Sequence, residues 1–270
     1  MAAIIVFAAS CQKAEETGTF YPREGVTAQE KRAAEDLIEN IPELVFWNPE
    51  TNEAYKFNIN ERNFSFATPN DGWNYSGTEE IIYVEDEGLV VITVPSFGAN
   101  TGGTIIAGSS ALDVDYTFCF SASDEALGLD LFDFGGELSG ISVVLGIAGD
   151  FEALMEGDLD EDADFFDVFH GFAMYIVYAD TAQGTYEILN WLDDIDEEPD
   201  YLADKGFSYV IDFAGEGIYF SSDGTLNVSG GSITFNGEYL AITDFLLDFG
   251  DDDDDLSFGY VSGYGTLGCN

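Results

Sequence analysis

The chain has 270 residues, of which 46% are hydrophobic and 15% aromatic, so it can bury a real core and is not a disordered acidic tail. Its 53 acidic residues against 7 basic ones give a formal net charge of −46, which excludes nucleic acid as a partner. Because all-β folds often reach about 200–250 residues as one unit, the length is compatible with a single domain.

The few basic residues are concentrated at the start of the chain. Six of the seven precede residue 63, and Lys205 is the only one after it. The later carboxylates therefore have almost no partner in their own chain, and their mutual repulsion must be relieved by salt or by bound cations. Since the Debye length falls from about 10 Å at 0.1 M salt to about 3 Å at 1 M, this composition predicts a marine or halophilic source.

An apolar run at residues 2–9 ends in small residues immediately before Cys11, and a polar segment, residues 12–16, follows. This pattern resembles the end of a bacterial lipoprotein signal peptide. The lysine and acidic residues after the cysteine also resemble the surface-export tag of Bacteroidota lipoproteins. The resemblance implies that residues 1–10 are a signal peptide, that Cys11 is lipidated, and that residues 11–26 are a tether.

That anchor would hold the protein at the outer membrane or cell surface, facing a saline exterior or the periplasm, without a transmembrane helix. The apolar run is short and no basic residue precedes it, which favours a natural signal peptide that begins upstream of Met1. The alternative is an ordinary apolar N-terminal strand or helix with one buried cysteine.

A helix is predicted over residues 27–40. Thr27 and Glu30 have the spacing of a capping box, in which each side chain accepts a hydrogen bond from the other residue's backbone N–H. Apolar residues follow at helical spacing on one face, and Pro42 ends the pattern. They are Ala34, Leu37, Ile38 and Ile41.

From residue 54 onward the hydrophobic period changes to two, which is typical of strands. Strands are predicted around Tyr55 to Phe66, over residues 81–84 and 89–94 as a hairpin, and over residues 112–120 as one half-buried strand. Further strands are predicted near residues 140–146, 173–178 and 185–191, with a short helix over residues 150–156.

The C-terminal third contains three turn pairs: Asp223-Gly224, Gly230-Gly231 and Asn236-Gly237. Their spacing predicts a meander of short strands, followed by a last pair over residues 256–261 and 263–267. The whole pattern predicts a mainly β fold: an antiparallel β-sandwich or barrel-like meander with one short N-terminal helix, forming a single domain over residues 27–270.

Two cysteines remain if Cys11 carries lipid. Cys119 and Cys269 form an even pair in an oxidising compartment, so a disulfide between them is predicted. It would tie a mid-chain strand to the C-terminal strand. The alternative is two free buried thiols.

The acidic loop at residues 158–164 has an aspartate at every second position, a rhythm that supplies oxygen ligands to calcium. The candidate ligands are Asp158, Asp160, Asp162 and Asp164. Ala163 and Phe169 stand where an EF-hand has glycine and glutamate, so this would be a weak site, and a solvated loop is the alternative.

A catalytic centre is not indicated. His170 is the only histidine, no Gly-x-Ser-x-Gly elbow occurs, and the abundance of Asp and Glu makes any carboxylate pair uninformative. Trp73 and Tyr75 lie in a segment rich in Asn and Gly, which suits either a glycan contact or the end of a core. The favoured function is a non-enzymatic surface lipoprotein that binds other surface proteins, adheres or serves the envelope. The alternative is a glycan-binding or glycan-degrading lipoprotein.

Overall fold

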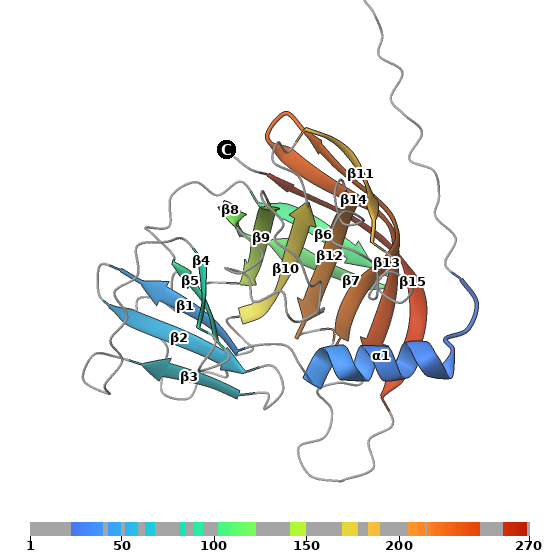
Figure 1. Ribbon diagram of the computed structural model, residues 1–270, viewed down its shortest axis with the longest axis horizontal. Helices are drawn as coiled ribbons and strands as arrows, with labels where there is room; N and C mark the ends of the chain where they lie inside the picture. The colour runs from blue at the N-terminus through green and yellow to red at the C-terminus, as the bar shows by residue number, and fades with distance from the viewer. Residues whose placement is uncertain are drawn as a thin grey trace, which may run out of the picture.

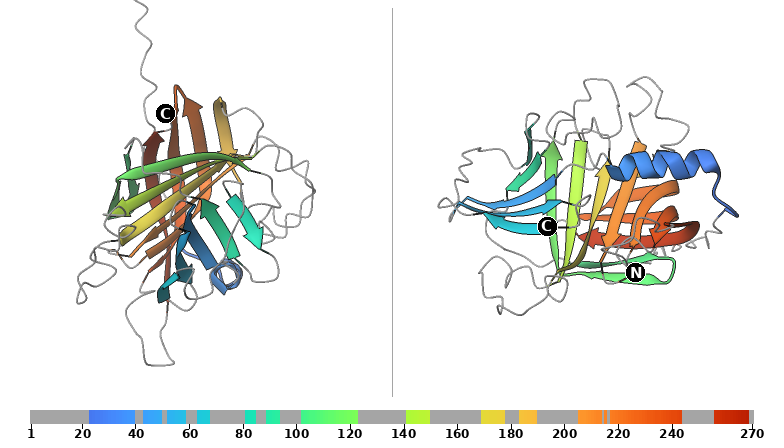
Figure 2. Two further views of the ribbon diagram at one scale, coloured as in Figure 1. Left: turned by 90° about the vertical axis from the view of Figure 1, so that its left-hand side faces the viewer. Right: turned by 90° about the horizontal axis from the view of Figure 1, so that it is seen from below.

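The computed structural model describes residues 23–39, 43–49, 52–58, 63–67, 81–84, 89–93, 102–122, 141–149, 169–177, 183–189, 205–213, 215, 217–243 and 256–268. These residues form one helix and fifteen strands arranged in two sheets (Figure 1). The larger sheet curls into a barrel-like shape (Figure 2). The predicted mainly β architecture with one N-terminal helix is therefore confirmed.

The helix α1 (Ala28–Glu39) begins as predicted. The Thr27 N–H donates to Glu30 Oε2 at 2.6 Å, and the Glu30 N–H donates to Thr27 Oγ1 at 3.2 Å, which completes the capping box. Ala34 of the predicted apolar stripe is fully buried. The helix runs across the long strands at one end of the larger sheet (Figures 1 and 2).

The smaller sheet has five strands. In spatial order they are β3 (Asn63–Ala67), β2 (Glu53–Asn58), β1 (Glu43–Asn48), β5 (Leu89–Thr93) and β4 (Ile81–Val84). The β4–β5 hairpin forms in the predicted antiparallel sense, whereas β1 and β5 are parallel. Its described core is Val45, Trp47, Ala54 and Val91.

The larger sheet has ten strands. In spatial order they are β7 (Ser110–Val114), β6 (Gly103–Ala107), β15 (Ser257–Gly268), β14 (Ser232–Thr243), β13 (Gly217–Ser229), β11 (Gly184–Ile188), β12 (Lys205–Asp212), β10 (Phe169–Val177), β9 (Ile141–Gly149) and β8 (Tyr116–Ala122). All neighbours are antiparallel except β11 and β12, and β12 also pairs with β13.

The two edge strands of this sheet, β7 and β8, are consecutive in sequence and separated by one residue, Asp115. The prediction of a single strand over residues 112–120 is therefore wrong. The Asp115 N–H donates to the Ile147 carbonyl at 2.8 Å, and Asp115 Oδ2 accepts from the Gly149 N–H at 2.8 Å. These two bonds hold a corner at which the chain passes from one edge of the sheet to the other, bringing the edges together.

The interior of the curled sheet is filled by side chains. A Cβ on Gly265 of β15 would lie 2.3 Å from the Tyr175 hydroxyl of β10, and a Cβ on Gly146 of β9 would lie 2.9 Å from side-chain atoms of both Val114 and Leu267. Opposite walls therefore touch at these glycines. Aromatic rings fill the space beside them, with Phe235 and Tyr239 at a centroid distance of 4.5 Å.

The C-terminal strands are longer than predicted. Only Gly230-Gly231 forms a turn, whereas the other two turn pairs lie inside β13 and β14, where Gly224 and Gly237 face each other. Gly224 has φ +121°, and a register shift between Ser221 and Asp223 marks a bulge. These glycines allow the backbones of β13 and β14 to approach closely within a twisted hairpin, and they do not reverse the chain. Likewise β15 is one strand and not a pair.

Candidate functional site

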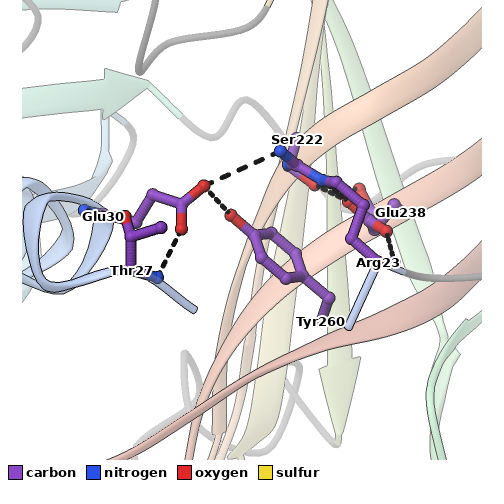
Figure 3. Close-up of polar contacts among 6 residues, drawn as sticks. All are labelled: Arg23, Thr27, Glu30, Ser222, Glu238 and Tyr260. Atoms are coloured by element: carbon purple, nitrogen blue, oxygen red, sulfur yellow. Dashed lines mark hydrogen bonds and ion pairs between the residues drawn. The ribbon is translucent and has the colours of Figure 1, made fainter. Parts of the chain in front are cut away.

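Six residues from two distant parts of the chain form a polar cluster on the outer face of the larger sheet (Figure 3). The segment before α1 and its first turn meet β13, β14 and β15 here. The members of this N-terminal clasp are Arg23, Thr27, Glu30, Ser222, Glu238 and Tyr260.

Glu238 of β14 is the centre of the clasp, because its side chain is fully buried and pairs with the Arg23 guanidinium. The Arg23 backbone N–H donates to Glu238 Oε2, and Arg23 Nε donates to Oε1 at 2.8 Å. The Ser222 hydroxyl donates to the same Oε1 at 2.9 Å. Ser222 belongs to the β13 bulge, so the irregular register is what brings this hydroxyl to the buried carboxylate.

Tyr260 of β15 carries the second half of the clasp. Its hydroxyl donates to Glu30 Oε1 at 2.6 Å, and the Arg23 guanidinium carbon lies 4.2 Å from the centre of its ring. Arg23 also forms a 3.7 Å ion pair with Glu30. Lys31, in the first turn of α1, makes a similar cation–π contact, with its Nζ 5.1 Å from the centre of the Phe258 ring. Two cations of the N-terminal segment thus lie on two aromatic rings of β15.

The clasp shifts the pKa values of its groups. Burial alone would raise the pKa of Glu30, but hydrogen bonds from Tyr260 and Thr27 and the charge of Arg23 outweigh it and lower that pKa. The pKa of Tyr260 is raised by burial and by its bond to the Glu30 carboxylate. For Arg23, burial opposes the charged form, yet the bond and the charge of Glu238 give a net raised pKa. The three shifts favour an ionised Glu30 and protonated Tyr260 and Arg23.

This arrangement holds the segment before α1 in place on the sheet. Both oxygens of Glu238 accept hydrogen bonds, and so do both oxygens of Glu30. Glu238, which is fully buried and accepts three hydrogen bonds, is held inside the fold and is not presented to solvent. The clasp therefore anchors the start of the folded domain to its largest sheet.

Replacing Glu30 with glutamine tests the electrostatic part of the clasp. A carboxyl whose pKa is lowered on folding stabilises the fold above its unfolded pKa, and loses that effect as pH falls through the folded value. We expect Glu30→Gln to be less stable than the wild type at pH 7, with the difference disappearing well below the ordinary value of 4.5. Urea unfolding of both proteins from pH 7 to pH 3 measures this.

Glu35→Gln is the matched control, because it removes the same charge from an exposed position of α1. Its effect at pH 7 should be the smaller of the two. Equal effects of the two substitutions at pH 7, or a Glu30→Gln difference that does not change at all between pH 7 and pH 3, would show that the carboxylate charge of Glu30 has no special role.

None of the lipidation, disulfide, calcium or glycan candidates from the sequence belongs to the N-terminal clasp. Cys11, Trp73, Tyr75 and Cys269 all lie outside the described residues, as do the candidate calcium ligands and the short helix predicted over residues 150–156. The candidate calcium ligands are Asp158, Asp160, Asp162 and Asp164. The calcium, glycan and lipid-anchor hypotheses at these positions therefore stay predictions.

Two residues that the sequence analysis considered, His170 and Cys119, are among the described residues. His170 lies exposed at an irregularity of β10, where its carbonyl accepts from the Phe213 N–H at 2.9 Å. Cys119 lies exposed on β8, and its Sγ is 4.0 Å from the carbonyl oxygen of Gly268, the residue before Cys269. The part of the chain that the structure describes contains no group of three or more His, Cys, Asp and Glu residues placed to hold a metal ion.

Sequence reasoning found Thr27 and Glu30 through their local spacing but missed Arg23, Ser222, Glu238 and Tyr260. One signal was present in the sequence, since Arg23 is one of only 7 basic residues and lies five residues before the first residue of the helix. Which carboxylate it meets depends on the register of β14, which residue spacing does not supply.

Among the described residues no helix is long and apolar enough to cross a membrane. No family model, no curated protein and no solved structure matches the chain.

Proposed function

We propose that the protein is an exported lipoprotein whose β domain is held at the outer membrane or cell surface through Cys11 and serves a non-enzymatic binding or envelope role. The observation that carries this proposal is the N-terminal clasp. It fixes Arg23, which residues 12–22 separate from the cysteine, to a buried carboxylate in the largest sheet.

A lipid-anchored domain needs a defined point at which the flexible connection ends and the fold begins. The clasp supplies one, because a charged hydrogen bond, a cation–π contact and a capped helix all act within residues 23–31. At about 3.5 Å per residue, residues 12–22 reach roughly 40 Å at most. The domain would therefore stay close to the membrane and present the surface opposite its tether.

The charge distribution supports an exterior location. The ion pairs among the described residues use only Arg23, Lys56 and Lys205 as cations. Most carboxylates of a chain with a net charge of −46 are left to solvent and counter-ions, which a saline exterior supplies. A disulfide between Cys119 and Cys269 would suit the same oxidising compartment.

A non-catalytic role is supported by the packing. Side chains fill the interior of the curled sheet, and the carboxylates of the N-terminal clasp are fully engaged. Among the described residues, the side chains left to solvent lie on the outer surface of the sheet, which supports binding as the proposed activity.

Lipidation is tested by Cys11→Ser in the full-length natural gene product, expressed with its leader in a Gram-negative host. We expect the wild type to incorporate an alkyne-tagged fatty acid and to sediment with membranes. Cys11→Ser should lose the label and become soluble, because the acyl chains supply the membrane affinity. Cys119→Ser is the matched control and should keep both properties. Persistent labelling or sedimentation of Cys11→Ser would contradict the proposal.

A further inference from the structure

The outer face of the long strands changes character along its length. Near α1 it is apolar and buried, with Phe220, Leu240 and Ile242 all at 1% exposure or less. Beyond Glu238 it becomes polar, with side chains that are half-buried or exposed, toward the β13–β14 turn at the end of the sheet away from α1 (Figure 1). This second half has no described element over it.

Strand register arranges the exposed half into two straight rows across six strands. Directly opposed residues of β11, β13, β14, β15, β6 and β7 form each row. The polar row is Thr185, Asn227, Thr234, Thr266, Thr104 and Asp113. The tyrosine row, two residues along each strand, is Glu187, Thr225, Asn236, Tyr264, Ile106 and Ala111.

Side chains of the polar row are held by hydrogen bonds between neighbouring strands. The Asn227 amide donates to the Thr185 hydroxyl at 2.9 Å, the Thr234 and Thr266 hydroxyls lie 3.0 Å apart, and the Thr104 hydroxyl donates to Asp113 at 3.0 Å. Each amide and hydroxyl keeps further donor or acceptor capacity. The row therefore presents preorganised polar groups to solvent, which lowers the entropy lost on binding.

The tyrosine row adds an apolar platform. Tyr264 and Ile106 are directly opposed, and they are the only large hydrophobic residues of the described chain that are strongly exposed, at 41% and 43%. Asn236 lies opposite Tyr264 on its other side. An aromatic face flanked by an amide and hydroxyls matches the two-sided chemistry of a sugar ring, which has an apolar face and a polar edge.

Charge selects among possible ligands. The four central strands contribute only uncharged side chains to the two rows, and of the two flanking acids Glu187 is paired with Lys205 at 2.9 Å. A chain with a net charge of −46 repels anionic polymers, and the four central strands of this face offer them no cation.

A protein partner fits less well. A stable protein interface buries about 800 Å² on each side around an apolar centre, whereas here only two large apolar side chains are exposed. Six strands spaced about 4.8 Å apart make each row roughly 24 Å long, which suits an extended polymer.

We propose that the two rows bind a neutral polysaccharide, with one sugar ring stacked on Tyr264 and neighbouring hydroxyl groups hydrogen-bonded to Asn236 and the threonines. This inference rests on the proposed function, because it names the ligand class of a binding protein at the cell surface. It places the glycan contact on the sheet, whereas the sequence alone suggested Trp73 and Tyr75.

The test uses the full chain carrying Cys11→Ser, so that glycan binding is measured independently of lipidation. Its affinity for soluble neutral β-glucan, mannan and xylan is measured by affinity electrophoresis in 0.5 M salt, with polygalacturonate as the anionic comparison. We expect saturable binding to at least one neutral polymer. Tyr264→Ala should weaken it by about tenfold or more, whereas Tyr264→Phe should retain it because the ring remains.

Glu35→Ala, on the exposed face of α1, is the surface control, and thermal unfolding verifies that each variant is folded. Three results would overturn the proposal: no binding to any neutral polymer, equal binding by the wild type and Tyr264→Ala, or binding to polygalacturonate alone. Sedimentation velocity tests whether a second copy of the chain occupies this face instead. A dimer that Tyr264→Ala dissociates would also overturn the proposal and make the face a self-association surface.

Discussion

Replacing Arg23 with methionine is expected to lower the free energy of unfolding by about 2 kcal/mol. Removing one partner of a buried ion pair leaves the other charge uncompensated, at a cost of about 3–5 kcal/mol. Here the cost should lie below that range, because the Arg23 side chain is 45% exposed to solvent and Glu238 keeps its bonds from the Arg23 backbone N–H and the Ser222 hydroxyl. Methionine retains an apolar chain over the Tyr260 ring, which limits the change to the charge and its hydrogen bond. Urea unfolding at pH 7 measures the effect.

A double-mutant cycle separates the ion pair from general charge effects. Arg23→Met combined with Glu238→Leu should recover much of the lost stability, because an apolar pair can replace a buried ion pair at little cost. Arg32→Met is the control for net charge, since it removes a cation from an exposed position of α1 and should change stability by about 0.5 kcal/mol or less. A similarly small effect of Arg23→Met, or strict additivity in the double variant, would show that the pair is not a stabilising contact.

The functional consequence of this substitution follows from where Arg23 lies. If the clasp marks the end of the tether, Arg23→Met should release the chain before α1 and advance N-terminal proteolytic trimming toward the helix. Glu238→Leu alone should also release it, since the arginine would lose its buried partner. The proposed tether thus has a readout that is independent of global stability.

Local sequence patterns predicted what local interactions determine. The capping box at Thr27 and Glu30 depends on residues three positions apart, and it formed as expected. The alternation of apolar and polar residues correctly indicated strands in most of the described regions, because the two faces of each strand meet different surroundings.

The errors lie where one pattern has two structural solutions. Asn236-Gly237 is a strong hairpin signal, yet here the glycine lies opposite Gly224 inside a long hairpin, where a Cβ would come 2.1 Å from the Asp223 carbonyl oxygen. A glycine that permits a turn also permits a close backbone approach, and only the partner strand decides between them. The same holds at Asp115, where an unbroken alternation continues through a corner that hydrogen bonds to β9 create.

The N-terminal clasp and the two rows around Tyr264 could not be predicted from the sequence for a related reason. The clasp around Arg23 and Glu238 requires the register of β13, β14 and β15, and the rows around Tyr264 require the register of six strands, because their members are far apart in the sequence. Threonine and asparagine on the outer face of a strand are unremarkable one at a time. Their alignment across the sheet is the informative feature.

Removing the predicted disulfide is expected to have the largest effect on stability. In the chain-entropy model, a cross-link that closes a loop of about 150 residues lowers the entropy of the unfolded chain. This raises the free energy of unfolding by up to about 5 kcal/mol. Cys119 is placed for this bond, because its Sγ lies 4.0 Å from the carbonyl of the residue before Cys269. β8 is an edge strand that pairs only with β9, so a bond to the end of β15 would fasten the free edge of the curled sheet.

The experiment uses the full chain carrying Cys11→Ser, in which only Cys119 and Cys269 remain. We expect no free thiol after denaturation without reductant, a cross-linked peptide in a non-reducing digest, and guanidinium unfolding that reductant shifts to lower concentration. Adding Cys119→Ser and Cys269→Ser should reproduce the reduced stability and remove the response to reductant. Two titratable thiols in the denatured chain would refute the disulfide. A cross-link without a change in stability would show instead that the corner at Asp115 and the contacts of Leu267 with β7 and β9 already hold the edges of the sheet together.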